Sequence, residues 1–516
     1  MGNSKEHHKK KANKMKKILV SLLYGDIVNL EYAIENIEKG NEVFILQCDR
    51  TMGICTRNVN GVGLLCSLCQ CGLKSVLNEM KLVNKAKLLR LSKMVAKDDI
   101  KESQSFNSDF NSVQELKNLT YKGAQVGYGA FSSYVTSSRN VMPDMTTEFK
   151  KYIQFLIRKE IIIYNVIERL HKEYNFDQIV LHNGRFAHTK PFLEFARNHK
   201  VDFVVTEFKI VNDQFLKDVF YNDIPHSISY LAKNVKENWE KGDPTNREEI
   251  GRSFFERKKM GMAAGDKVYT KNQHAGELPE GWNELVENIT IFNSSEDEFC
   301  SVSKEYDNNI LFSNQFVALK TIFEHYKGDK TKHFYLRIHP NLDSVPYRSH
   351  MALYELKYDN VTIISPTSTI SSYTLLDKSD KIIIFNSTMG VEATYWGKPV
   401  ISLTKYIYWE LGLLHHPETN EQLWEMIDDK ELKVITNDNL IKYSYWLLHP
   451  NYPIANRIPV GKPYFKLIGN HMGNVTIMKL FGSYNLFFLL YKLFSRINLF
   501  PKFKGLPCTE PYIISK

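Results

Sequence analysis

Alternating apolar runs and amphipathic segments organise the first half of the chain. An apolar run over 18–23 is followed by a segment over 28–39 with helical spacing that ends at Gly40. Continuing along the chain, the pattern predicts strands over 43–47, 178–181 and 202–206 and helices over 145–174 and 184–199. Strands that alternate with helices in this way are typical of a mainly parallel sheet covered by helices.

The same pattern starts afresh after a charged helical segment over 234–265 and a stretch over 267–282 that contains glycine and proline. We place the domain boundary there. The second half predicts strands over 289–292, 333–338, 361–364, 381–385 and 400–403 and helices over 314–326, 388–396, 420–428 and 439–449. Two successive layers of this kind predict an α/β protein with two facing Rossmann-like domains and a ligand at the carboxyl ends of the strands.

These boundaries give a complete division of the chain. The expected parts are a disordered basic tail over 1–17, a first Rossmann-like domain over 18–265 with a cysteine-rich insertion over 48–71, a linker over 266–286, a second Rossmann-like domain over 287–450 and a helical tail over 451–516. A chain of 516 residues with 43% hydrophobic and 24% charged residues can bury cores of this size.

The charge of the chain bears on its partners. The net charge is +9, and seven lysines among the first seventeen residues supply much of the excess. Because this charge sits on a tail and not on a folded face, it is only weak support for a nucleic-acid-binding protein, and no nucleic-acid partner is expected. Two interpretations of the tail remain: a solvated disordered terminus, or attraction to an anionic membrane surface.

No segment reaches about 18 uninterrupted apolar residues, so no membrane-spanning helix is expected. The apolar run over 18–24 is cut off by Gly25 and Asp26 and is too short for a signal peptide. The segment 480–500 is rich in Phe, Leu and Tyr but interrupted by polar residues, which predicts a helix lying on the protein's own core or on a membrane interface. We therefore expect a cytoplasmic protein. A further expectation is peripheral contact with the inner face of the cell membrane.

The segment 382–393 carries the strongest chemical signal, because a buried strand runs through a hydroxyl-rich turn into a helix. Such a turn directs backbone N–H groups at an anion, and Ser387 and Thr388 add hydroxyl donors. Gly390 would let a phosphate approach the backbone closely. Helix capping is the alternative, but a capping box needs the acidic residue three positions after the hydroxyl, and Glu392 falls five after Ser387. The spacing favours a ligand role for Glu392, such as accepting ribose hydroxyls.

A second apolar strand ends in Arg337-Ile338-His339-Pro340. Pro340 forces the chain out of the sheet, so that Arg337 or His339 is presented at its rim. Both can donate to a phosphate oxygen, and His339 can also protonate or stabilise a departing phosphate. Two anion-competent loops at strand ends of one domain predict a phosphate or pyrophosphate site.

With these motifs the second half, over about 289–408, resembles the capsule polysaccharide biosynthesis group of GT-B glycosyltransferases, which is similar in style to bacterial Kdo transferases and sialyltransferases. The matching residues are Ser294-Ser295-Glu296-Asp297-Glu298, Gln315, Arg337 to Asn341, Ser371-Ser372-Tyr373, Asn386 to Glu392 and Gly397 to Val400. The resemblance implies that the second domain binds a nucleotide-sugar donor. The donor-binding candidates are Arg337, His339, Ser294, Ser295, Ser372, Tyr373, Asn386, Ser387, Thr388, Gly390 and Glu392. No Asp-x-Asp motif stands out, so no catalytic metal is expected.

The first half resembles the family more loosely, through 182–185, 206–207 and 127–133. In GT-B enzymes the first domain binds the acceptor and supplies the base. Glu207 and His182 sit at or just past predicted strand ends, so we expect Glu207 to deprotonate the acceptor hydroxyl, with His182 as the next candidate base. Arg185 would orient the acceptor or neutralise charge. The alternative for each of the three is an ordinary surface or capping residue.

Five of the seven cysteines lie between Cys48 and Cys71. Cys66 and Cys69 have the spacing of a tetrahedral zinc pair, and Cys48 and Cys55 would complete four thiolates, which predicts a structural zinc. The alternative is a set of reduced thiols, because stable disulfides are disfavoured in the cytosol.

Three functions fit these observations. The first is a glycosyltransferase that moves a sugar from a nucleotide-sugar donor to a surface polysaccharide or lipid-linked glycan acceptor. The second is a sugar-nucleotide epimerase on the same architecture, which would convert the donor without any acceptor. The third is a non-catalytic module for polysaccharide assembly or export, against which the intact phosphate motifs argue.

Overall fold

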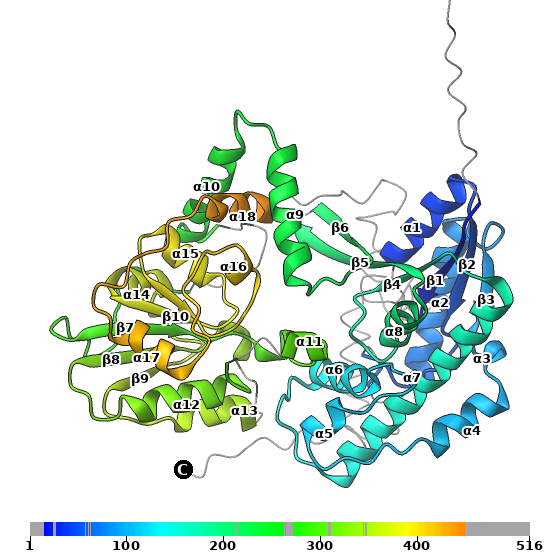
Figure 1. The fold of residues 1–516 in the computed structure, drawn as a ribbon, viewed down its shortest axis with the longest axis horizontal. Helices are drawn as coiled ribbons and strands as arrows, with labels where there is room; N and C mark the ends of the chain where they lie inside the picture. The colour runs from blue at the N-terminus through cyan, green and yellow to red at the C-terminus, as the bar shows by residue number, and fades with distance from the viewer. Residues whose placement is uncertain are drawn as a thin grey trace, which may run out of the picture.

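A computed structural model describes residues 15–448 except 24–26, 57, 60, 62, 212–213, 263, 265–271, 308–310, 344 and 346–347. The predicted helical tail, including 480–500, and residues 1–14 of the basic tail lie outside the described residues. The framework consists of two sheets, each accompanied by helices, which lie side by side in Figure 1.

The first sheet has six strands in the order β3-β2-β1-β4-β5-β6. The strands are β1 (Lys17–Leu22), β2 (Glu42–Gln47), β3 (Lys87–Arg90), β4 (Gln178–His182), β5 (Asp202–Val211) and β6 (Gln214–Tyr221). β1 to β5 are parallel, and β6 runs antiparallel to β5. Ile18, Leu19 and Val20 of β1 are fully buried, as expected for a central strand covered on both faces.

Eight helices among the described residues accompany this sheet. They are α1 (Ile27–Glu38), α2 (Gly63–Glu79), α3 (Leu91–Met94), α4 (Lys97–Ser105), α5 (Val113–Lys117), α6 (Val126–Ser138), α7 (Thr147–Tyr174) and α8 (Lys190–His199). α7 is the long helix expected over 145–174, and its buried apolar stripe packs against α4, α6 and α8. The cysteine-rich segment is only partly an insertion, because its second half begins α2, the crossover helix between β2 and β3.

Two predicted elements of this half are wrong in extent. The helix expected over 184–199 begins only at Lys190, with Pro191 in its first turn, because Gly184 adopts a left-handed backbone with φ +85° and the chain loops before the helix. The strand expected to end at Thr206 continues to Val211 because it pairs with β6, which the pattern did not reveal.

The second sheet has five parallel strands in the order β11-β10-β7-β8-β9. They are β7 (Glu287–Phe292), β8 (Lys332–Arg337), β9 (Val361–Ile364), β10 (Lys381–Ile384) and β11 (Val400–Ser402). The order reverses between β7 and β10, so the loops that follow these two strands diverge at a topological switch point. The main helices of this half are α12 (Gln315–His325), α14 (Ser372–Lys378), α15 (Met389–Tyr395) and α17 (Asn420–Asp428).

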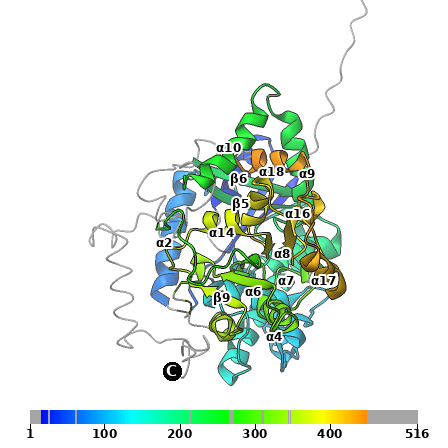
Figure 2. The same ribbon diagram turned by 90° about the vertical axis from the view of Figure 1, so that its left-hand side faces the viewer.

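Three helices join the halves. The charged segment expected as one helix forms the end of α9 (Ile228–Lys241) and then α10 (Arg247–Lys259), which are separated by a turn at Gly242-Asp243-Pro244. α18 (Asn439–Leu448), from the end of the described chain, returns to pack on both, and the three helices lie together in Figures 1 and 2.

The carboxyl edges of the two sheets face one another. Arg185, which follows β4, donates a hydrogen bond of 2.7 Å to the carbonyl of Glu298, which follows β7. Lys117 at the end of α5 pairs with Asp307 of α11 (Lys304–Asp307) at 2.6 Å. Two Rossmann-like α/β domains that meet along their carboxyl edges form the GT-B fold expected from the sequence.

Candidate functional site

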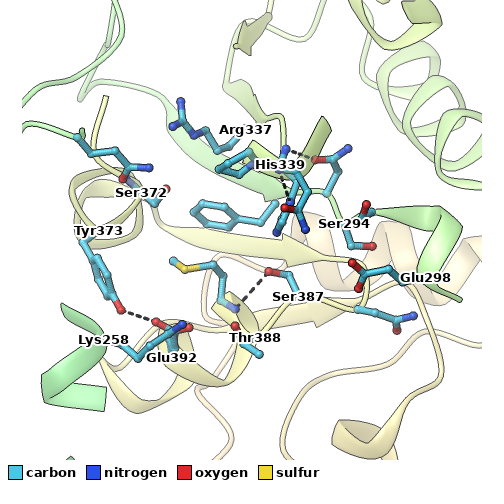
Figure 3. A pocket seen from close by; sticks show the side chains of 18 of the residues that line it. Lys258, Ser294, Glu298, Arg337, His339, Ser372, Tyr373, Ser387, Thr388 and Glu392 are labelled. Carbon is cyan, nitrogen blue, oxygen red and sulfur yellow. Dashed lines mark hydrogen bonds between the residues drawn. The ribbon is translucent and has the colours of Figure 1, made fainter. Parts of the chain in front are cut away.

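The loops after β7, β8 and β10 enclose a pocket of about 260 Å³ at the switch point of the second sheet. Ten of the eleven predicted donor-binding residues line it: Ser294, Ser295, Arg337, His339, Ser372, Tyr373, Asn386, Ser387, Thr388 and Glu392. The strand-end reasoning therefore brings together residues that are about 100 positions apart in the chain. Figure 3 labels these side chains around the pocket, except Ser295 and Asn386.

Arg337 is the last residue of β8 and is 2% exposed. Its two terminal nitrogens donate to the carbonyls of Ser365 and Ser368 at 3.0 and 3.1 Å, whereas its Nε has no hydrogen-bond partner in the described part of the chain. Burial lowers the pKa of this guanidinium to about 10, which leaves it charged at neutral pH. A buried cation held by neutral carbonyls provides positive charge for an anionic ligand.

His339 begins the loop after β8, and its backbone N–H donates to Asn293 Oδ1 at 2.7 Å. Its Nδ1 accepts the backbone N–H of Asn341 at 3.1 Å, which assigns the ring proton of the neutral imidazole to Nε2. Burial is the main cause that lowers the pKa of His339 to about 4. The side chain is therefore neutral at physiological pH and suited to donate a hydrogen bond, whereas direct proton transfer to phosphate would require the minor protonated form.

Ser387 and Thr388 form the turn after β10. Ser387 Oγ accepts the backbone N–H of Met389 at 3.3 Å, while Thr388, which precedes α15, makes no side-chain capping bond. Capping and ligand binding are compatible at Ser387, because a hydroxyl that accepts one hydrogen bond still has its own hydrogen to donate.

The structure gives Gly390 a different role from the expected phosphate approach. Gly390 is buried in α15 and does not line the pocket. A Cβ at this position would come 2.6 Å from Ile384 Cδ1 and 3.1 Å from Leu414 Cδ1. The missing side chain allows α15 to pack closely on β10, which is a packing requirement.

Glu392 is 1% exposed and accepts a hydrogen bond from the Tyr373 hydroxyl, as Figure 3 shows. Lys258, from α10, lines the same pocket. A carboxylate, a phenol and an ammonium group therefore line the pocket. They can donate and accept hydrogen bonds with a ligand's hydroxyl groups and can interact with its charge.

Ser294 and Ser295, after β7, form the opposite wall. Gln315, the first residue of α12, accepts the backbone N–H of Ser294 at 3.1 Å and donates to its carbonyl and hydroxyl at 3.2 and 3.0 Å. This two-way bonding fixes the loop after β7.

Ten further lining residues were not named as donor-binding candidates, although Glu298, Pro340, Asn341 and Met389 lie within the motifs that carry the resemblance. The ten are Lys258, Met262, Gln273, Phe292, Asn293, Glu298, Phe299, Pro340, Asn341 and Met389. Asn293 was recoverable, because it directly follows a predicted strand in the manner of Asn386. Lys258 had no local signal, since it lies in a charged helix that reaches the pocket only through the packing of the two domains.

The three catalytic candidates of the first domain lie together beside the interface. Glu207 accepts a hydrogen bond from Asn183, and its carboxylate lies 3.7 Å from His182 Nε2. Although β5 continues beyond it, Glu207 remains at the carboxyl edge of the parallel strands, because β4 ends at His182, whose register partner is Thr206. Arg185 bonds Glu298 and Thr136, and burial is the main cause that lowers its pKa.

Neither Glu207 nor His182 lines the donor pocket, and Arg185 reaches only its rim through the Glu298 carbonyl. The structure therefore places the three residues close to one another but outside the lining of the donor pocket.

The predicted zinc ligands do not form a recognisable site. Cys66 and Cys69 lie on α2, and Cys66 Sγ accepts a hydrogen bond of 3.1 Å from Asn58. Within the described ranges no group of three or more His, Cys, Asp or Glu side chains is arranged to hold a metal ion. The structural zinc stays a prediction.

Residues 312–445 match the family model described as "Capsule polysaccharide biosynthesis protein". The match spans Gln315, the Arg337 to Asn341 motif and the Asn386 to Glu392 turn, and it confirms the resemblance inferred from those residues. A comparison with curated proteins found no match. The described helices include none that is long and apolar enough to cross a membrane.

Solved structures of sugar-modifying enzymes are also similar. The beta Kdo 2,4 transferase of Thermosulfurimonas dismutans KpsC is 14% identical with a TM-score of 0.35, and the alignment covers 58% of this chain and 88% of that one. A putative UDP-N-acetylglucosamine 2-epimerase from Listeria monocytogenes is 13% identical with a TM-score of 0.26, covering 87% and 94%. The Methanocaldococcus jannaschii UDP-GlcNAc 2-epimerase, in complex with UDP-GlcNAc and UDP, is 11% identical with a TM-score of 0.23, covering 83% and 98%.

Proposed function

We propose that this chain is a glycosyltransferase of capsule polysaccharide biosynthesis that transfers a sugar from a nucleotide-sugar donor to a surface polysaccharide or lipid-linked glycan. One observation carries the proposal: Arg337, His339 and the Ser387-Thr388 turn converge on a pocket at the switch point of the second sheet. Open α/β sheets bind nucleotides at this place.

The chemistry of the pocket suits a departing nucleotide phosphate. When the bond between the anomeric carbon and the phosphate oxygen breaks, negative charge collects on that oxygen. The buried Arg337 cation and the Nε2–H group of His339 are preorganised donors for such charge. Glu392 and Tyr373 at the other end of the pocket would take the ribose hydroxyls of the donor.

Acceptor activation belongs to the same proposal. From the sequence, Glu207 beside Asn183 and His182 is one candidate for the base, and Arg185 is the candidate for holding the acceptor. A second candidate base, Glu296, is compared with Glu207 below. Attachment of the basic N-terminus to an anionic membrane would bring the enzyme to a membrane-borne acceptor.

The first test is binding of the nucleotide alone. CMP, UDP, GDP and CDP are added separately to the protein, and thermal unfolding is followed. One of them should raise the Tm, since a ligand at 100 times its Kd stabilises by about 2.7 kcal/mol. Arg337→Ala should abolish this shift, whereas Arg252→Ala, which removes an exposed arginine of α10, should not. Equal shifts in both variants would contradict the assignment of the pocket.

The second test separates transfer from epimerisation. The nucleotide sugar that contains the preferred nucleotide is incubated with enzyme, with and without methyl glycosides as acceptors, and the products are separated. Glycosides should appear only with acceptor. Conversion of the donor sugar to its epimer without acceptor would show that the chain is an epimerase.

A further inference from the structure

A second cavity, of about 200 Å³, adjoins the donor pocket. The two share Ser294, Phe299 and Asn386 as lining residues. The second cavity is bounded by the first domain on one side, through Gln114 and Lys117. A molecule in this cavity would therefore lie between the domains and beside the donor pocket.

The half-buried Glu296 lines this second cavity. It begins the short 3-10 helix η1 (Glu296–Glu298) and accepts the backbone N–H of Gln315 at 3.2 Å. Gln315 is also the residue that fixes Ser294 in the donor pocket. Gln315 therefore fixes Glu296 and the donor-binding loop relative to each other, while Glu296 lines the neighbouring cavity.

The charges around Glu296 leave its carboxylate without a cationic partner. In the described residues Lys117 is paired with Asp307 at 2.6 Å, Asp297 lies 3.8 Å from Arg139, and no ion pair includes Glu296. Lys405 lies over the Trp409 ring, 3.7 Å from its centroid.

Burial is the main cause that raises the pKa of Glu296 to about 7, with Asp297 adding to the rise and Lys117 opposing it. A carboxylate with these surroundings can accept a proton at neutral pH.

Glu207 has different surroundings. Its carboxylate is engaged by Asn183 and lies near His182, and Glu207 lines neither the donor pocket nor the Glu296 cavity. Of the two carboxylates, Glu296 is the one that lines the cavity adjoining the donor pocket.

We propose that the Glu296 cavity receives the acceptor hydroxyl and that Glu296 is the catalytic residue that removes its proton. The inference rests on the proposed function. In the transfer step the acceptor O–H bond breaks and its proton passes to the Glu296 carboxylate. The acceptor oxygen forms the new bond to the anomeric carbon, and the electron pair of the old C–O bond leaves on the nucleotide phosphate, against Arg337 and His339.

The test compares Glu296→Gln with Glu207→Gln, and uses Glu280→Gln, at an exposed position, as the control for handling and assay. Each protein is checked for its Tm, for nucleotide affinity by calorimetry and for transfer to the methyl glycoside that the wild type uses. Glu296→Gln should lower kcat by about two to four decades, the usual worth of a general base, with nucleotide affinity within about twofold of the wild type. Glu296→Asp should recover part of the loss.

The pH profile gives a second readout. A base with a pKa of about 7 is active in its ionised form, so wild-type kcat should fall as the pH decreases through about 7. The residual rate of Glu296→Gln should lack this limb.

Loss of turnover in Glu207→Gln with full turnover in Glu296→Gln would overturn the inference and leave Glu207 as the base. Retention of the acidic limb in Glu296→Gln would also overturn it. If the wild type bound no nucleotide and transferred no sugar, the proposed function itself would be wrong. The wild-type assay therefore separates failure of the function from failure of the Glu296 assignment.

Discussion

At the scale of single residues, Arg337 and His339 are close in sequence but differ in charge at neutral pH. Burial lowers the pKa of both, yet a guanidinium at about 10 stays charged whereas an imidazole at about 4 stays neutral. The pocket therefore offers one fixed charge and one neutral N–H donor.

We predict that His339→Ala weakens binding of the preferred nucleotide, because the donor to its phosphate is lost. A hydrogen bond to a charged group is worth about 1.5 to 3 kcal/mol, which corresponds to about one to two decades in Kd. His339→Asn retains a side-chain N–H and should lose less. Calorimetric titration at pH 7 and 8 measures both, and the affinity should be equal at the two pH values, because an imidazole with a pKa of about 4 is neutral at each. Unchanged affinity in His339→Ala would contradict the phosphate role.

The cysteine prediction is also tested residue by residue. If Cys48, Cys55, Cys66 and Cys69 bind a structural metal, elemental analysis of the purified protein should find about one zinc per chain, and Cys66→Ser should lose it together with stability. Cys300→Ser is the matched control, because Cys300 lies in the second domain away from the cluster. Metal-free protein of equal stability would reject the prediction.

At the scale of elements, close helix packing depends on glycines that the sequence pattern does not flag. A Cβ on Gly251 of α10 would come 2.7 Å from both the carbonyl oxygen and Cγ2 of Ile441 in α18. Because one of these atoms is backbone, it cannot rotate away, and the two helices would have to separate.

Gly251→Ala should therefore destabilise the protein by about 1 to 3 kcal/mol, the usual cost of overpacking, even though alanine is the better helix former. Gly63→Ala is the control, since nothing lies within 4 Å of a Cβ at the start of α2. Urea unfolding of both variants gives the comparison. A Gly251→Ala protein as stable as the wild type would show that α18 shifts without cost.

Strong local patterns explain which elements could be predicted. β1 and β7 are central, buried strands that are mostly apolar, and α17 has both a Thr419 cap and one apolar face. Each was therefore expected within one or two residues of its observed bounds. β6 and β3 are edge strands with mixed composition, and their assignment depends on a neighbouring strand that a local window does not contain.

The same reasoning explains the site. The donor-binding turns at Ser294, Arg337 and Ser387 follow strands of a single sheet, so strand ends predict that they meet. Lys258 instead acquires its position from contacts between elements far apart in the chain.

At the scale of the whole molecule, the first domain helps to shape the donor pocket of the second. Arg139, at the end of α6, donates a hydrogen bond of 2.7 Å to the carbonyl of Asn341, and its Nε lies 3.8 Å from Asp297. Asn341 follows the His339-Pro340 motif, and Asp297 follows the loop of Ser294 and Ser295. One side chain of the first domain therefore contacts both loops that form the rim of the pocket.

Replacing Arg139 should weaken nucleotide binding although Arg139 does not line the pocket. Because its side chain is 44% exposed, the lost hydrogen bond and ion pair should cost only about 1 kcal/mol, or about fivefold in Kd. Arg139→Gln is compared with Arg252→Gln, which removes a more exposed pair within α10. Added salt should narrow the difference between wild type and Arg139→Gln, since the ion pair is screened. If calorimetry gave the same Kd for wild type and Arg139→Gln at low salt, the rim would be shaped by the second domain alone, and the first domain's part would be confined to the acceptor.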